Sequence, residues 1–323
     1  MASCKMTSGR MRMSRQPVTR WRYHTPTVTV DPEPARAPML SRTSRGPVLA
    51  RRRLRSELRQ LREKAELAPE HVAREMVWSV SKLVRIENGT VGISVNDTKA
   101  LLALYGAAEP ETVADLLGLA ADSRRRMWWA KHRDHVPATF LEFIGLEDDA
   151  TQIRQYNPFV VPGLVQTAEY ARTLAARDAG APVTRQVEIR MQRQRLLFDR
   201  TDPPEYIAIL DESVLYRPFG NETVLRDQLN ALLDHMREDH IDLAVVPTET
   251  VGRPGVPVGF VMLGFADEKD DSVVFYDQPG SDVAAEAPAD VARFAEVFDR
   301  LLALGLRGAD AIAAIKRARD RIG

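Results

Sequence analysis

The feature that most constrains the fold is a run of short helical patterns between residues 47 and 126, punctuated by proline and glycine. Its central stretch, residues 73–90, reads AREMVWSVSKLVRIENGT. Trp78, Leu83 and Ile86 follow one another at spacings of five and three residues, with polar residues in the gaps. Such spacing is typical of an amphipathic helix, whose polar face lies either in solvent or against a partner.

Five such helices are expected in about 75 residues, which makes one small all-helical domain. The first starts near Pro47 and places Leu54, Leu58 and Leu61 on one face. Proline is favoured at a helix start and Asn-Gly at a helix stop, and both mark boundaries here. The other expected helices are residues 69–76, residues 80–87 closed by Asn88-Gly89, a fourth capped by Asn96 or Ser94 and reaching Gly106, and a fifth from Pro110 to Arg126.

The rest of the chain predicts a mixed α and β domain, so the fold class is α plus mixed α/β. Helices are expected at residues 141–155, 167–177, 183–198, 222–236 and 287–304. Four apolar runs of strand length are expected at residues 206–210, 243–246, 259–265 and 272–276. These elements suggest helices packed on a small sheet of about four strands, either parallel or mixed. The expected boundaries are a disordered basic extension (1–45), a helix-turn-helix domain (46–126) and a C-terminal domain (127–323).

The charge is distributed unevenly along the chain, although the formal net charge is zero. Residues 1–126 hold 23 Lys and Arg against 13 Asp and Glu, whereas residues 127–323 hold 22 against 32. This asymmetry favours binding of a polyanion by the N-terminal part of the chain and a different role for the C-terminal part. There is no apolar run long enough to span a membrane, no secretory pattern, and a single cysteine, Cys4. We therefore expect a cytoplasmic protein with no membrane association.

The stretch around residues 69–90 has the form of two short helices joined by a tight turn, which can enter the major groove of B-DNA. Trp78, Leu83 and Ile86 would hold the second helix against the core. The residues expected to point outward and contact base edges or phosphates are Ser79, Val80, Ser81, Lys82 and Arg85. If the indole of Trp78 is fully buried, Trp78→Ala should destabilise the domain by roughly 3 to 5 kcal/mol.

Phosphate contacts are expected from residues around this motif. The candidates are Arg51, Arg52, Arg53, Asn88 and Thr90. A solvated helix face is the alternative interpretation of residues 51–53. A domain of this size normally reads two half-sites as a pair, so a homodimer on double-stranded DNA is expected. Trp128, Trp129 and the C-terminal domain would supply the dimer interface.

The motifs add a family resemblance. Residues 67–89, with WSVSK followed by RIENG, resemble the helix-turn-helix of Xre, or lambda-repressor-like, transcriptional regulators and are similar to an actinobacterial branch of them. In that branch a C-terminal domain of unknown activity, often described as antitoxin-like, follows. VPGLVQTAEYA (residues 161–171), RMQRQR (190–195), LDESVL (210–215), Gln228-Leu229 and Val245-Val-Pro247 are similar to its recurrent pattern. The resemblance covers about residues 47–320 and implies a small partner protein encoded by an adjacent gene.

Two residues depart from the family pattern. Pro69 stands where the family commonly has Gln, which puts one phosphate clamp in doubt. Val77 stands in the turn where the family commonly has Gly, and a β-branched residue is strained at positive φ. The turn therefore either avoids positive φ or carries strain.

Catalytic patterns in the C-terminal domain are weak, so we expect no enzyme, no cofactor and no metal. His132 and His135 lie one helical turn apart without a nearby Cys or carboxylate pattern. Asp211-Glu212 ends an expected strand, where adjacent side chains point to opposite faces unless a helix or turn begins there. Two hypotheses follow: a sequence-specific regulator whose C-terminal domain binds a partner protein or ligand, and, as the alternative, a hydrolase or transferase fused to a DNA-binding module.

Overall fold

A computed structural model describes residues 46–134, 136–177, 182–250, 258–278 and 281–322, with the side chains of residues 277–283 left undescribed. The expected N-terminal extension, residues 1–45, lies outside these ranges. The five expected helices are confirmed, although the fifth ends at Asp122 and not at Arg126. Ser94 rather than Asn96 caps the fourth, its Oγ accepting from the Asp97 backbone N–H. Their bounds are α1 Pro47–Lys64, α2 Pro69–Glu75, α3 Val80–Glu87, α4 Val95–Leu104 and α5 Pro110–Asp122.

These helices share one buried cluster of apolar side chains. Leu54 and Leu58 of α1 lie in it, as the spacing predicts, together with Leu83 and Ile86 of α3. A helix of eight residues such as α3 is unstable alone, so its stability comes from this packing. The helix therefore keeps its polar face outward only while its apolar face stays in the cluster.

The turn between α2 and α3 contains a valine at positive φ. Val77 has φ +53°, and its N–H bonds to the Arg74 carbonyl while the Trp78 N–H bonds to the Ala73 carbonyl. These two bonds close the helix in the way that usually employs glycine. The Val77 side chain is 91% exposed, so it gains little from burial in return. The turn thus carries backbone strain, which decides between the two outcomes left open by the sequence. By contrast, the stop after α3 uses Gly89 at φ +75°.

A buried ion pair joins α1 to the end of α3. Arg62 Nε lies 2.6 Å from Glu87 Oε1, and Arg62 Nη2 lies 3.0 Å from Glu87 Oε2. Arg62 Nη1 also donates to the Leu67 carbonyl at 2.9 Å. The hydrogen bond to Glu87 raises the pKa of Arg62. This two-point contact fixes the angle of α3 against α1, because a planar guanidinium and a planar carboxylate match in only a few orientations.

The C-terminal domain is built on one mixed sheet of six strands in the order β3-β2-β1-β4-β5-β6, so the expectation of about four strands was too low. The strands are β1 Gln152–Asn157, β2 Glu205–Asp211, β3 Ile241–Val246, β4 Phe260–Gly264, β5 Val273–Gln278 and β6 Ser281–Ala285. β1, β2 and β3 are parallel, whereas β4 pairs antiparallel with β1, β5 with β4, and β6 with β5.

The helix expected at residues 141–155 was wrong at its C-terminal end. The helix stops at Asp149, and Gln152–Asn157 form β1 between β2 and β4. Only Ile153 and Tyr156 of this strand are buried, so its sequence lacks the apolar run that marks a central strand. Pairing on both edges stabilises it instead. β6 was also missed, since its sequence SDVAA is short and has a single β-branched residue.

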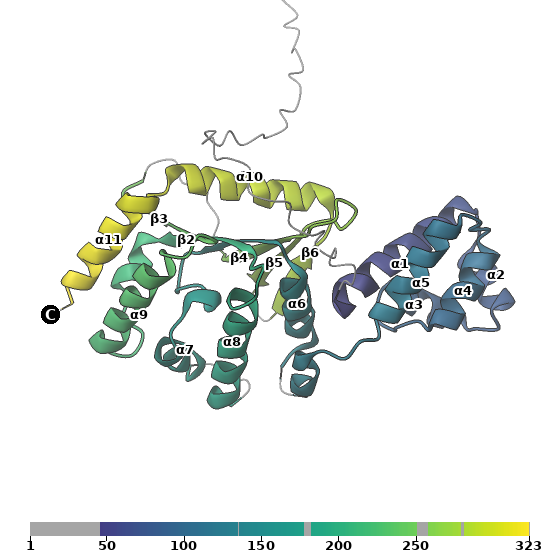
Figure 1. The fold of residues 1–323 in the computed structure, drawn as a ribbon, viewed down its shortest axis with the longest axis horizontal. Coiled ribbons are helices and arrows are strands. Elements are labelled where there is room, and N and C mark those ends of the chain that lie inside the picture. The colour runs from purple at the N-terminus through teal and green to yellow at the C-terminus, as the bar shows by residue number, and fades with distance from the viewer. Residues whose placement is uncertain (1–45, 135, 178–181, 251–257, 279–280, 323) are drawn as a thin grey trace, which may run out of the picture. The chain divides into compact units, whose positions relative to one another are not determined.

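Helices cover both faces of this sheet (Figure 1). Helix α10 packs on one face of the sheet, where Phe298 and Leu301 lie against Ile207 and Ile209 of β2. Tyr206, Ala208 and Leu210 alternate with them and face the other cluster, where α7, α8, α9 and α11 contribute. The helices are α6 Ala138–Asp149, α7 Ala168–Ala175, α8 Val183–Phe198, α9 Glu222–His235, α10 Pro288–Leu304 and α11 Gly308–Asp320. Three 3-10 turns, η1 Trp128–His132, η2 Gly163–Val165 and η3 Glu212–Tyr216, complete the described elements.

Val77→Gly should stabilise the helix-turn-helix domain. The left-handed conformation costs an L-residue roughly 1 to 2 kcal/mol, and glycine offsets part of the gain through its freer unfolded state, so a net gain of about 1 kcal/mol is expected. Chemical denaturation of the two proteins measures it. Val84→Gly, at an exposed position inside α3, is the matched control and should destabilise by roughly 0.5 to 1 kcal/mol. Equal effects of the two substitutions would show that Val77 is not strained.

Glu87→Gln should destabilise the same domain by about 3 kcal/mol, because it leaves the Arg62 charge buried without its counter-charge. Glu63→Gln, which removes the exposed partner of Arg59 and a longer, 3.7 Å contact with Arg62, is the control and should cost less than about 1 kcal/mol. Urea unfolding monitored by circular dichroism compares the three proteins. A loss at Glu87 no larger than that at Glu63 would rule out a structural role for the buried pair.

Candidate nucleic-acid interface

The polar face of α3 is presented to solvent as the sequence indicates. Ser79 caps the helix, its Oγ accepting from the Lys82 backbone N–H at 3.2 Å. Ser79, Val80, Ser81 and Arg85 are exposed. Arg85 makes no ion pair with any described residue, so its guanidinium is free to bind an acceptor. Side chains at the start and on the outer face of such a helix are the ones that reach base edges.

Val84 belongs to this face and was missed by sequence reasoning. Its side chain is 40% exposed and follows the exposed Val80 by one helical turn. The interpretation of the pattern assigned outward roles to polar residues and to Val80 only. Two apolar side chains on a major-groove face are chemically suitable for contact with thymine methyl groups. Their exposure, which nothing in the fold requires, is the signal that identifies them.

Lys82 is an expected outward residue whose charge is partly engaged within the protein. Its Nζ lies 3.7 Å from the centroid of the Trp78 ring and 4.0 Å from Asp97 Oδ2. Trp78 itself is only half-buried at the edge of the cluster, so it is a weaker anchor than Leu83 or Ile86. The condition attached to the large cost of Trp78→Ala, a fully buried indole, is therefore not met.

A basic hollow of about 960 Å³ begins at the C-terminal end of α3. It brings together four of the residues expected to contact phosphate: Arg51, Arg52, Asn88 and Thr90. Seven arginines line it: Arg51, Arg52, Arg55, Arg124, Arg125, Arg126 and Arg133. Arg124 and Arg126 are exposed, have no ion-pair partner among the described residues and were not among the sequence candidates. The run of three arginines directly after α5 was their signal.

The arginines of α1 differ in how far they are already paired. Arg51 Nη2 donates to the Ser123 carbonyl at 3.3 Å. Arg52 Nε lies 3.3 Å from Glu286 Oε1, which Arg55 also contacts. Arg53 donates to the Lys269 carbonyl, pairs with Glu57 and does not line the basic hollow. The uncompensated positive charge of the hollow therefore comes mainly from the residues after α5.

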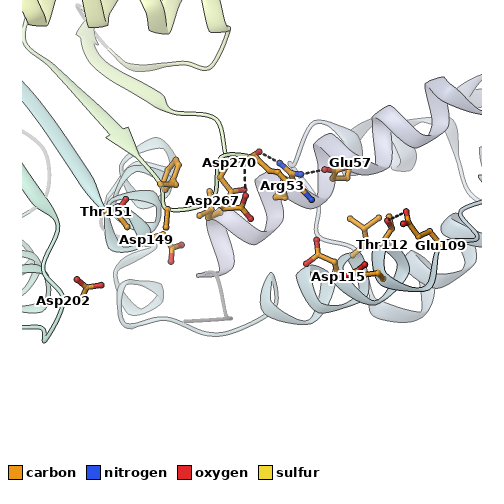
Figure 2. Close-up of a pocket in the computed structure, with 16 residues that line it drawn as sticks. Arg53, Glu57, Glu109, Thr112, Asp115, Asp149, Thr151, Asp202, Asp267 and Asp270 are labelled. Atoms are coloured by element: carbon orange, nitrogen blue, oxygen red, sulfur yellow. Dashed lines mark hydrogen bonds and ion pairs between the residues drawn. The ribbon is translucent and has the colours of Figure 1, made fainter. Parts of the chain in front are cut away.

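Another hollow, of about 820 Å³, has the opposite chemistry (Figure 2). Arg53 and Glu57 line it together with carboxylates from several segments, including Glu109, Asp115, Asp149, Asp202, Asp267 and Asp270. Such a lining repels phosphate, so this surface is not part of a DNA-binding face. In the part of the chain that the structure describes, no group of three or more His, Cys, Asp or Glu side chains is arranged to hold a metal ion.

The paired acids have local structural roles. Asp211 Oδ1 accepts from the Ser213 N–H at 2.9 Å and starts η3. Glu212 Oε2 accepts from the Thr248 N–H at 2.8 Å. His132 is buried, and His135 lies outside the described residues. These contacts match the helix-start interpretation of Asp211-Glu212.

The fold and this face define a helix-turn-helix protein, the class whose second helix enters DNA. Comparison with protein families agrees: residues 53–125 match a helix-turn-helix domain. Residues 140–317 match a domain of unknown function (DUF5753), and since this match covers more than half of the chain, the chain belongs to that family. No curated protein and no solved structure gave a significant match. No helix among the described residues is long and apolar enough to cross a membrane.

Proposed function

We propose that this protein is a sequence-specific, DNA-binding transcriptional regulator. The exposed face of α3, with the unpaired Arg85 and the basic hollow at the end of the helix, is the observation that supports it most. The face supplies base-edge contacts and the hollow supplies phosphate contacts, which is the usual division between specificity and affinity. Ser79, Val80, Ser81, Lys82, Val84 and Arg85 are assigned to the first role, and Asn88, Thr90, Arg51, Arg52, Arg124 and Arg126 to the second.

The regulator works as a homodimer in this proposal. One helix-turn-helix reads a single half-site, and two copies spaced a helical turn apart supply the affinity and specificity that an operator requires. The motifs of residues 67–89 support assignment to the Xre family. The C-terminal DUF5753 domain then receives a signal, either from a small protein encoded by an adjacent gene, as in antitoxin-like pairs, or from a small ligand.

An enzyme fused to a DNA-binding module is the second candidate, and the geometry favours it less. Asp211 and Glu212 are both occupied by backbone N–H groups. Co-purification of a small neighbouring-gene product would support the partner role, whereas isolation of a lone dimer would count against it. Hydrolysis or group transfer that depends on Asp211 would overturn the regulator assignment in favour of the enzyme.

Arg85→Ala should lower the affinity for the DNA upstream of the protein's own gene by roughly tenfold or more and leave the salt slope of binding nearly unchanged, because Arg85 is assigned to a base edge and not to a phosphate. The melting temperature should not change, because the side chain is exposed. Gel shifts at several salt concentrations measure both quantities. Arg237→Ala removes an exposed arginine that is paired with Asp234 in the C-terminal domain and should leave binding unchanged. Absence of any salt-sensitive, sequence-dependent complex with the wild-type protein would refute the proposal that it is a DNA-binding regulator.

A further inference from the structure

A pocket of about 250 Å³ lies within the C-terminal domain, apart from the α3 face and the basic hollow. Its walls come from α6, β1, the segment after β1, α7, α8, β4 and β5. The apolar lining is partly aromatic, with Phe140, Phe143 and Phe275, and partly aliphatic, with Val160, Val161, Leu174 and Val261. The rings of Phe260 and Tyr276, which also border it, pack against Phe294 of α10. A concave site that combines an apolar wall with a few polar groups is the usual form of a small-molecule site.

The polar groups of this pocket are mainly hydrogen-bond donors, because the acceptor atoms are already used. Gln155 Oε1 accepts from the Tyr206 hydroxyl at 2.9 Å. Asn157 Oδ1 accepts from the backbone N–H groups of Phe159 and Val160 at 3.0 and 3.1 Å. The amide nitrogens of Gln155 and Asn157 have no partner among the described residues. The pocket therefore offers N–H groups to a ligand that carries acceptors.

Arg190 adds a positive charge to the same lining. Of its five N–H donors, one is used among the described residues: Nη1 donates to Gln166 Oε1 at 2.8 Å. No described carboxylate pairs with it. Burial, and then the neighbouring charge of Arg193, lower the pKa of Arg190 to about 10. A half-buried guanidinium without a counter-charge is unfavourable, and an anion in the pocket would compensate it.

Arg193, one helical turn further along α8, provides the internal comparison. Its guanidinium is fully matched by Glu147, with Nη2–Oε1 and Nε–Oε2 distances of 2.6 and 2.8 Å. It also stacks near Phe143, 5.0 Å from the ring centroid. Arg193 is thus neutralised by Glu147 and packs against the aromatic wall, whereas Arg190 has no counter-charge among the described residues. Where a buried arginine has a structural role, as Arg193 does, a carboxylate of the protein pairs with it.

The segment beside Arg190 is held rigidly by side-chain amides. Gln166 Nε2 donates to the Val161 carbonyl at 2.6 Å. Gln194 Nε2 donates to the Gly163 and Gln166 carbonyls at 2.8 and 2.9 Å. Gln228 accepts from the Thr167 N–H and donates to the Val165 carbonyl. Preformed geometry of this kind lowers the entropy cost of binding.

We propose that this pocket binds a small amphipathic carboxylate, with the carboxylate on Arg190 and the amide nitrogens of Gln155 and Asn157, and an aromatic or alkyl body against Phe140, Phe143 and Phe275. The planar guanidinium suits a carboxylate, and the aromatic walls suit an apolar body. The inference deepens the proposed function, since it names the chemical class of an effector for the C-terminal domain. The site itself rests on the pocket and not on DNA binding.

Isothermal titration of the full-length protein, without DNA, tests the site with two matched pairs of probes. 2-Naphthoate and octanoate carry the carboxylate, and 2-naphthamide and octanamide have the same bodies without the charge. At least one carboxylate should bind at least tenfold more tightly than its amide. Arg190→Met should reduce that difference to less than threefold. Arg195→Met, an exposed arginine on the same helix, should leave it unchanged.

Val160→Phe provides a second variant should Arg190→Met fail to fold, since it fills the pocket without changing charge and should abolish binding of the same carboxylate. Equal binding of acid and amide, wild-type binding by both variants, or no binding of either carboxylate would overturn the site. Gel shifts are run separately on the same samples. Loss of DNA binding with intact carboxylate binding would refute the proposed regulator and leave the pocket standing, and the reverse result would refute the pocket alone.

Discussion

The orientation of α3 depends on the buried pair between Arg62 and Glu87. With only eight residues, α3 cannot hold its shape or angle alone, and Leu83 and Ile86 restrain it along one stripe. Glu87 adds a directional contact at the last helical position, close to where Asn88 and Thr90 enter the basic hollow. Apolar packing is not directional, whereas a bidentate guanidinium–carboxylate contact is. The exposed face and the residues proposed to contact phosphate therefore keep one geometry relative to each other.

Sequence reasoning predicted the helices whose ends are set by residues close to those ends in the chain. Proline at the start of α1, α2 and α5, serine caps on α3 and α4, and glycine after α3 all act within a few residues of where they stand. β1 could not be found in this way. Its sequence QIRQYN carries little apolar character, and its structure comes from pairing with β2 and β4, whose residues lie 50 or more positions away.

The candidate interface shows the same limit. Leu83 and Ile86 identify the inner stripe of α3, so the outer face follows from helix geometry, and Ser79, Ser81 and Arg85 lie where they were expected. Helix geometry does not show which charged side chains are already paired within the protein. Arg52 is held by Glu286, more than 200 residues later, and Lys82 lies over Trp78, while Arg124 and Arg126 have no such partner. Which arginines are free for phosphate is decided by tertiary contacts, and no pattern in residues 51–53 encodes it.

Arg190 and Arg193 make this point most sharply, because they belong to one motif, RMQRQR, and lie on one face of one helix. Their sequence environments are nearly equivalent, yet Glu147 pairs with Arg193 and leaves Arg190 without a carboxylate among the described residues. A fold selected for stability alone would gain from replacing Arg190 by an apolar residue of similar volume, since a lone buried charge is costly. The Arg190 charge in an aromatic pocket lined by hydrogen-bond donors is stabilised when an anion binds there. In the two proposals made for this protein, its two positive surfaces thus serve different anions: a solvated polyanion at exposed arginines, and a small, desolvated carboxylate at a half-buried one.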